Sequence, residues 1–184
     1  DSKGSERRSF TVSVPVGSQS KEFYIPLFDD STYEGDEIYT IRGLSGGGSE
    51  TWFTGTASHD MIIKDNDTQP TVTLEQTGNA VEGTPFTYTV RLSSAVDADV
   101  TVELKFGKDG DTAKAGQDYA PYVLPVTIPA GQITATFTIS LPDDEYSEGD
   151  ESFSVWIDRV TAGQALIGTG TGNPLITVIE DFIS

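Results

Sequence analysis

Polar and apolar residues alternate with a period of two along much of the chain. Such alternation puts every second side chain on one face, which is typical of a β-strand with one buried side. β-branched and aromatic residues fill these runs, and Gly, Pro, Asp and Asn separate them. No stretch carries a sustained stripe at the 3.6-residue spacing of a helix. The pattern predicts an all-β sandwich, with strands over residues 71–74, 86–92, 100–104, 123–128, 133–141 and 153–157.

The chain also repeats itself. Residues 10–37 align without a gap with residues 124–151 at an offset of 114, and twelve of these 28 positions are identical. After a shift of one or two residues, residues 63–65 match residues 179–181 in the same way. The repeating unit is therefore about 115 residues long, which is the size of one sandwich domain.

This period predicts two domains of unequal completeness. Residues 70–184, the second repeat, make one complete domain. Residues 1–69, the first repeat, supply only the C-terminal part of another, whose early strands are missing. Residues 65–70 form a short linker that Pro70 would stiffen. A partial sandwich exposes sheet edges and apolar core, so we expect the first repeat either to be frayed or to need strands of another chain. The plainest expectation is a piece of a longer array.

Composition narrows the range of partners. The net charge is −18 and the sequence pI is near 4.1, so we expect no binding of nucleic acid by bulk electrostatics. There is no cysteine and only one histidine, His59, which excludes disulfides and argues against a transition-metal site. No apolar run is long enough to suggest direct membrane insertion. One histidine and no cysteine also leave no Ser–His–Asp or Cys–His set, so we expect no enzyme activity.

The acidic residues gather at two places in each repeat. One is a loop with the pattern Asp-Asp-x₃-Glu-Gly-Asp-Glu, which begins at Asp29 and again at Asp143, and the other is the end of the last strand. If both lie at the same end of the sandwich, about six carboxylates crowd one small volume and repel unless a cation lies among them. Ca²⁺ suits such a site because it takes six to eight oxygen ligands. A single acidic loop is more often a solvated turn, but its recurrence in both repeats favours Ca²⁺.

The order of short motifs in the second repeat resembles the Calx-beta domain family. The motifs are residues 81–83 (Val-Glu-Gly), 111–119, 128–131 (Ile-Pro-Ala-Gly), 143–144 with 148–151, and 179–181. The resemblance implies a seven-stranded, immunoglobulin-like antiparallel β-sandwich that binds Ca²⁺ at one end through its loops and last strand. The implied ligands in the second repeat are Glu82, Asp118, Asp143, Asp144, Glu148, Glu151, Glu180 and Asp181, with the backbone carbonyl of Tyr146.

The same resemblance implies a second, less complete set of ligands in the first repeat. Its members are Asp29, Asp30, Glu34, Glu37, Asp65 and Asp67, with the carbonyl of Thr32. Counterparts of Glu82 and Asp118 are missing there, so we expect the first site to be the weaker one. In the second repeat, Phe182 stands where the family often has a third terminal acid, which lowers the expected occupancy of that site too.

The family occurs in the Na⁺/Ca²⁺ exchanger, in giant animal surface receptors and in long bacterial repeat adhesins. A cysteine-free, very acidic tandem rich in Thr and Gly is more similar to the bacterial adhesins. We therefore expect a secreted or cell-surface, Ca²⁺-binding extender module of a multi-repeat adhesion protein. Its expected partners are neighbouring repeats of the same chain, with other cell-surface proteins or glycans as further candidates. Two alternatives stay open: a regulatory Ca²⁺ sensor of an attached membrane transporter, and a Ca²⁺-dependent glycan-binding module.

Overall fold

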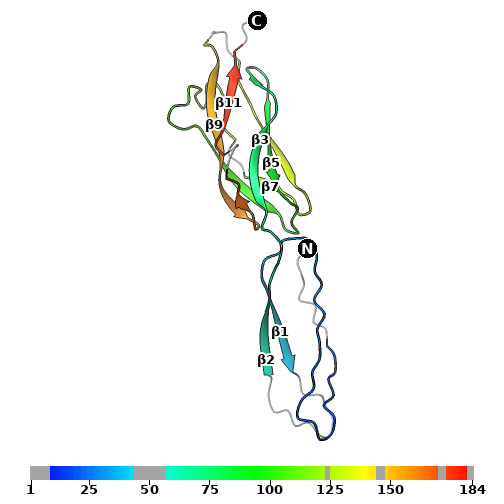
Figure 1. Ribbon diagram of the computed structural model, residues 1–184. Helices are drawn as coiled ribbons and strands as arrows, with labels where there is room; N and C mark the ends of the chain where they lie inside the picture. Colours follow the sequence, from blue (N-terminus) through cyan, green and yellow to red (C-terminus); the bar gives the residue numbers. More distant parts are fainter. Residues whose placement is uncertain (1–8, 44–56, 123–124, 144–147, 170–172, 182–184) are drawn as a thin grey trace. The chain divides into compact units, whose positions relative to one another are not determined.

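The computed structural model describes residues 9–43, 57–122, 125–143, 148–169 and 173–181 (Figure 1). By its internal contacts the chain divides into two compact units, Asp1–Ser31 and Thr32–Ser184. The described residues form strands and turns but no helix, so the predicted all-β class is confirmed. Accordingly, none of them forms a helix that could cross a membrane. The predicted division into domains at residues 69 and 70 stays a prediction.

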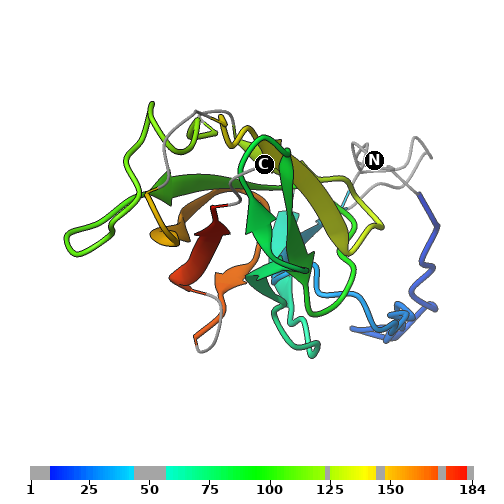
Figure 2. The ribbon, with the colours of Figure 1, turned by 90° about the horizontal axis from the view of Figure 1, so that it is seen from above.

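Two sheets face each other in the larger unit. One has four strands in the order β10 (Leu166–Ile167), β3 (Thr71–Gln76), β5 (Phe86–Leu92) and β8 (Thr134–Ile139). The other has five, in the order β4 (Ala80–Val81), β11 (Leu175–Glu180), β9 (Glu151–Ala162), β6 (Val100–Phe106) and β7 (Val126–Ile128). Figure 2 shows red β11 in one layer and olive β8 in the other. Within these two sheets, seven described strands have three or more residues, which agrees with the expected immunoglobulin-like sandwich.

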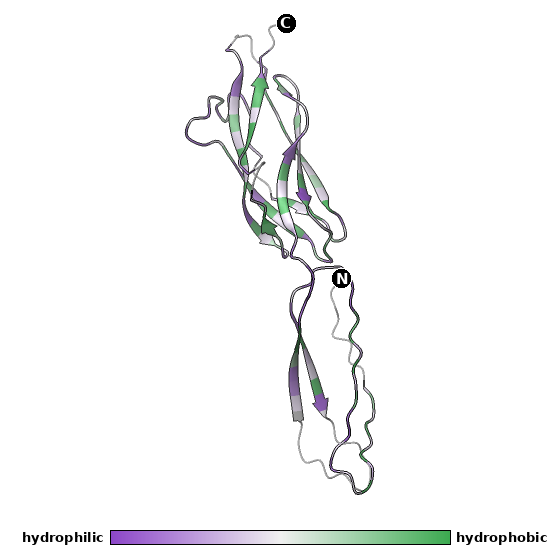
Figure 3. Cartoon of the chain, in the orientation of Figure 1, coloured by the Kyte–Doolittle hydropathy of each residue, from purple (hydrophilic) through white to green (hydrophobic). Residues whose placement is uncertain are grey.

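Alternation in the sequence decides which side chains meet between the sheets. β5 alternates buried and more exposed residues along its whole length, and Tyr88 and Val90 are fully buried. In Figure 3 the same alternation appears as green and pale bands along the strands. The ring of Tyr88 stacks on Phe137 of β8 with centroids 5.1 Å apart, and its hydroxyl bonds Thr177 Oγ1 of β11 at 2.6 Å. The core therefore joins both sheets by apolar packing and by one satisfied polar contact.

A third sheet lies in the same unit and consists of β1 (Glu37–Gly43) and β2 (Ala57–Ile63). These strands pair antiparallel, with Glu37 opposite Ile63. In the sandwich, β9 and β11 pair antiparallel with Glu151 opposite Ile179. The two pairs thus have the same register at positions that the sequence alignment makes equivalent. The same stretch of repeated sequence forms the same strand pair twice.

Candidate metal centre

The first acid of the candidate centre, Asp118, lies in a tight turn just before the buried core residue Tyr119. In this turn, Asp118 Oδ2 accepts a hydrogen bond from Lys114 N at 2.5 Å, and Gly116 N donates to Tyr119 O at 2.8 Å. Gly116 has a φ of +87°, a conformation that favours glycine. Tyr119 is buried and stacks on Phe153 of β9 with ring centroids 4.1 Å apart. The stack anchors the turn, so Asp118 is held at the edge of the core, where it is only 9% exposed.

Two further acids approach Asp118 from the start of β9. Glu151 is the first residue of that strand, and Glu148 lies three residues before it. Carboxylate oxygens of Asp118, Glu148 and Glu151 lie within 4.8 Å of one another. Among the described residues, this is the only group of three or more acids, histidines or cysteines that is so close. The sequence placed these three residues in separate motifs, and the fold brings them together.

The electrostatics of this carboxylate cluster are unfavourable without a cation. Burial first, then the hydrogen bond with Asp118 and the negative charges of Asp118 and Glu148, together raise the pKa of Glu151 to about 7. The charge of Lys114 opposes this shift but does not cancel it. Carboxylates that resist ionising together are stabilised by a positive ion placed among them. An all-oxygen donor set of this kind fits Ca²⁺ and lacks the His or Cys that Zn²⁺ prefers.

Asp181 holds the turn that carries Glu148. Its Oδ2 accepts hydrogen bonds from Glu148 N at 2.8 Å and from Gly149 N at 2.9 Å. Gly149 has a φ of +77°, which lets both amides point at one carboxylate oxygen. The resemblance implied a ligand at Asp181. The structure shows that one of its oxygens has a second task, which is to tie the end of the last strand to the acidic turn.

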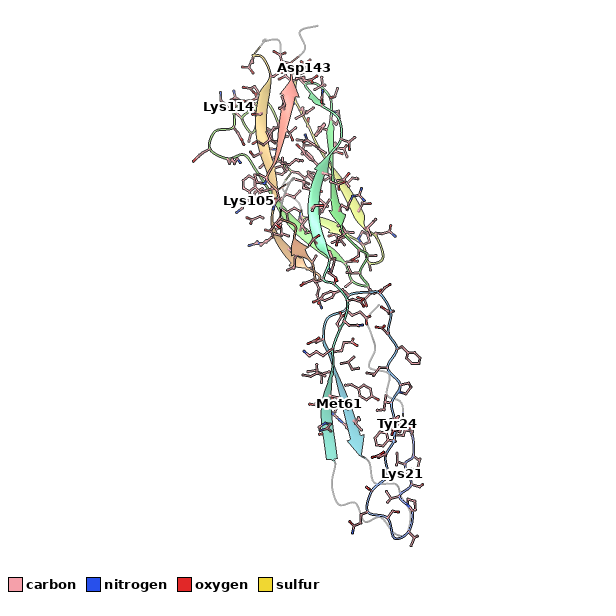
Figure 4. All side chains as sticks on the ribbon, in the orientation of Figure 1. Lys21, Tyr24, Met61, Lys105, Lys114 and Asp143 are labelled. Atoms are coloured by element: carbon pink, nitrogen blue, oxygen red, sulfur yellow. The ribbon has the colours of Figure 1, made fainter. Side chains whose placement is uncertain are left out.

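The other acids expected in the second repeat lie on segments that meet at the same end of the sandwich. Glu82 N donates to Glu180 O at 3.3 Å, and Gly83 N donates to Leu141 O at 2.9 Å. Gly83 has a φ of +73°, and a Cβ there would lie 3.2 Å from the Cβ of Asp143. Figure 4 labels Asp143 and Lys114 at the end where β11 terminates. Of these acids, Asp181 contacts the turn that carries Glu148, whereas Glu82, Asp143 and Glu180 lie on segments that contact one another. None of the four belongs to the carboxylate cluster, and Asp144 and Tyr146 lie outside the described residues.

Sequence reasoning missed two neighbours of the expected ligands. Asn79 Nδ2 donates to Glu180 Oε1 at 2.5 Å, which occupies one oxygen of an expected ligand. Lys114 contributes both its backbone amide to Asp118 and its charge to Glu151. Neither residue lies in an acidic motif, so no pattern of acids could have found them. Lys114 is part of the segment 111–119 that carried the family resemblance, but its positive charge gave no reason to place it beside a metal.

The expected acids of the first repeat are arranged differently. Asp29 and Asp30 lie in the compact unit Asp1–Ser31, and Thr32, Glu34, Glu37, Asp65 and Asp67 lie in the other. In the part of the chain that the structure describes, none of them belongs to a group of three close acids. Asp65 Oδ2 instead accepts from Glu34 N at 2.6 Å and Gly35 N at 2.5 Å, and its Oδ1 accepts from Asp67 N at 2.8 Å. These bonds, that of Asp67 first, lower the pKa of Asp65 although burial opposes them.

Comparison with known proteins identifies the family and the fold of the chain. The Calx-beta domain family model matches residues 65–181. The apo form of the Calx CBD1 domain superposes with a TM-score of 0.54 at 22% identity, over 62% of this chain and 99% of that one. CBD12 from CALX1.2 superposes with a TM-score of 0.51 at 23% identity, over 61% of this chain and 45% of that one. These two structures share the fold. The family match covers more than half of the chain, which therefore belongs to the Calx-beta domain family, a family of Ca²⁺-binding modules.

Proposed function

We propose that the chain is a structural extender of a multi-repeat extracellular or cell-surface adhesion protein, of the kind found in bacterial adhesins. In this function Ca²⁺ neutralises the acidic end of each repeat, closes its loops and stiffens the joint to the next repeat. The direct partners are neighbouring repeats of the same polypeptide. The module has a binding and mechanical role, and it performs no catalysis.

The observation that carries this proposal is the position of Asp65 and Asp67. Strand β2 ends at Ile63 and β3 begins at Thr71, so both acids lie in the short connection between them. Asp65 binds the amides of Glu34 and Gly35 and also that of Asp67. The acids expected to bind metal for one repeat thus lie within a few residues of the first strand of the next repeat. An ion held there restrains the backbone of the connection itself, which is what an extender needs.

The energetics suit an extracellular setting. A ligand that binds only the folded state stabilises it by RT ln(1 + [L]/Kd), which is about 2.7 kcal/mol at a hundredfold excess over Kd. Extracellular Ca²⁺ modules have Kd values of roughly 10⁻⁴–10⁻³ M. At a net charge of −18, each bound ion also relieves self-repulsion. Such a chain is loose where Ca²⁺ is scarce and stiffens once it reaches millimolar Ca²⁺.

Thermal unfolding in millimolar Ca²⁺ and in excess chelator tests the proposal. We expect Ca²⁺ to raise Tm by several degrees, Mg²⁺ to raise it less, and Asp118→Asn to remove most of the Ca²⁺ effect. Asp109→Asn removes the same charge from an exposed loop and is the matched control. Small-angle scattering of the same samples reports stiffening of the connection. A Tm that Ca²⁺ does not change, or an equal loss in both variants, would refute the proposal.

A regulatory Ca²⁺ sensor is the second candidate, and the fold shared with the Calx CBD1 domain favours it. A sensor works at intracellular Ca²⁺ levels, so its sites bind with Kd values of roughly 10⁻⁷–10⁻⁵ M. Isothermal titration separates the two functions by the midpoint alone. A micromolar midpoint would favour the sensor, and a midpoint near millimolar would favour the extender.

A further inference from the structure

The loop that follows β6, residues 107–118, lies along the start of β9. Thr112 N and Ala113 N both donate to Ser152 O at 3.0 Å, and Ser152 N donates to Thr112 Oγ1 at 2.8 Å. Strand β6 pairs with β9 as far as Val155. Between Val155 and the first residue of β9, the loop therefore takes the place of the neighbouring strand and binds the backbone groups of β9 instead.

One side chain of this loop, that of Asp111, binds both the loop and β9. Its Oδ2 accepts hydrogen bonds from Ser154 N and from Lys108 N, each at 2.8 Å. Its Oδ1 accepts a third from Ser154 Oγ, also at 2.8 Å. Ser154 is fully buried, and hydrogen bonds to an ionised carboxylate are roughly twice as strong as those between neutral groups. Asp111 therefore fixes the first turn of the loop to β9.

The other end of the loop carries Asp118, the buried acid of the carboxylate cluster. Lys114, which Figure 4 labels, donates its amide to Asp118 Oδ2 at 2.5 Å, and its carbonyl accepts from Asp118 N at 3.0 Å. Glu151, a second acid of the cluster, directly precedes Ser152, to which the loop is bound. The distance between these two acids thus depends on how the loop is attached to β9.

We propose that Asp111 is a positioning residue of the metal centre, which holds the 107–118 loop against β9 and so keeps Asp118 beside Glu151. Asp111 does not belong to the carboxylate cluster itself, so it acts on a bound ion through Asp118. When the loop is detached, the cluster lacks one acid, and the apparent affinity falls with the fraction of molecules whose loop is attached. The inference rests on Ca²⁺ binding at this cluster, and it is the same for an extender and for a sensor.

Isothermal titration with Ca²⁺ of the parent chain, Asp111→Ala and Asp111→Asn tests this. We expect Asp111→Ala to weaken the strongest site at least about fivefold, because the support of a ligand is lost. An asparagine oxygen can still accept from both backbone amides, and its amino group can donate to Ser154 Oγ, so Asp111→Asn should bind within about twofold of the parent. If Asp111 acted through its charge, the asparagine variant would be as weak as the alanine variant, which would overturn the proposal.

Amide exchange in chelator gives a readout that needs no metal. Because Lys114 N is bonded to Asp118 Oδ2, its exchange should accelerate in Asp111→Ala and should stay near that of the parent in Asp111→Asn. Ser154→Ala removes one of the three bonds of Asp111, and it should cause a smaller change in the same direction. This variant also decides the question if Asp111→Ala does not fold.

The matched control for a general loss of stability is Val72→Ala. Val72 is fully buried and lies on β3, in the other sheet of the sandwich. We expect this change to lower Tm and to leave the Ca²⁺ affinity unaltered. An unchanged affinity in Asp111→Ala, or an equal loss in Val72→Ala, would overturn this proposal alone. A parent chain that binds no Ca²⁺ would overturn the proposed function together with it.

Discussion

Two strand pairs of the molecule share a local design and differ in their surroundings. In the first, β1 and β2 are tied to the Glu34–Gly35 turn by Asp65, and in the second, β9 and β11 are tied to the Glu148–Gly149 turn by Asp181. The register is the same, and one aspartate oxygen binds the same two amides in both. Local structure is thus encoded by local sequence, because each copy forms it in a different environment.

The two pairs differ in what packs against them. The second pair has Asp118 beside Glu148 and Glu151, which completes the carboxylate cluster. The alignment of the first repeat begins at residue 10, opposite residue 124, so the first pair has no counterpart of Asp118. The second pair is also covered by β6, and β1 has no second partner among the described strands. The acidic turn thus forms from the C-terminal half of a repeat alone, whereas the carboxylate cluster and the core need the N-terminal half as well.

The largest expected difference between the pairs is in their cores. We expect Phe153→Ala to lower the free energy of unfolding by about 3–5 kcal/mol, because it removes a buried ring and leaves a cavity beside Tyr119. The aligned change Tyr39→Ala should cost less than about 1 kcal/mol, since that side chain keeps much of its contact with water. Urea unfolding in chelator, followed by tryptophan fluorescence, measures both. Equal costs would mean that Tyr39 is buried in solution as Phe153 is, and that the two pairs do not differ in their cores.

The strands of the sandwich were predictable because one face of each is buried. Alternation located β5 at its observed bounds and placed β8 within the predicted residues 133–141, since one buried face imposes a period of two. It gave the extent of β9 less well, because residues 158–162 continue the strand past the last apolar position of the predicted segment. Pairing between strands carries no such local signal, so the sheet order could not be derived from the pattern.

The sequence predicted which acidic residues belong to the candidate site, but not which of them lie close together in the fold. Repetition of the acidic loop identified Glu148, Glu151 and Asp181 as a set, and the family resemblance added Asp118. Which oxygens point at one another depends on packing that the sequence does not state, above all on the Tyr119–Phe153 stack. For the same reason the sequence could not show that one carboxylate oxygen of Asp181 accepts hydrogen bonds from backbone amides.

The second expected effect concerns the aspartate that ties each turn. We expect Asp181→Ala and Asp65→Ala each to cost about 1–3 kcal/mol locally, because each leaves two backbone amides without their acceptor. The measurement is amide exchange at residues 148–149 and 34–35 in chelator. If the turns are equivalent, both variants accelerate exchange at their own turn and leave the other unchanged. A response at only one turn would break the equivalence.

The third expected difference between the two strand pairs is in their contribution to Ca²⁺ affinity. We expect Glu151→Gln to weaken the strongest Ca²⁺ site at least about tenfold, which corresponds to about 1.4 kcal/mol, because it removes one charge from the carboxylate cluster. The aligned change Glu37→Gln removes the same charge from the first pair and should leave that strongest site unaltered. Isothermal titration of both variants reports the difference. Weakening by Glu37→Gln alone would place the stronger site in the first repeat and reverse the comparison.

The smallest expected effect is a pH dependence confined to the second pair. In the fold the pKa of Glu151 is raised to about 7, so folding favours its protonated form. The free energy of unfolding of the metal-free protein should therefore fall as the pH rises from about 4.5, the ordinary pKa of Glu, to about 7. Above pH 7 it should change little. Solvent reaches this carboxyl, so the loss should be smaller than the effects above. The lowered pKa of Asp65 acts in the opposite sense and only below its ordinary value of 3.8, outside this window.

Urea unfolding of metal-depleted protein at several pH values should show this decrease of stability with pH in the parent chain and in Glu37→Gln. It should be abolished in Glu151→Gln. A slope that survives in Glu151→Gln would place the titrating group elsewhere and remove the electrostatic distinction between the two pairs.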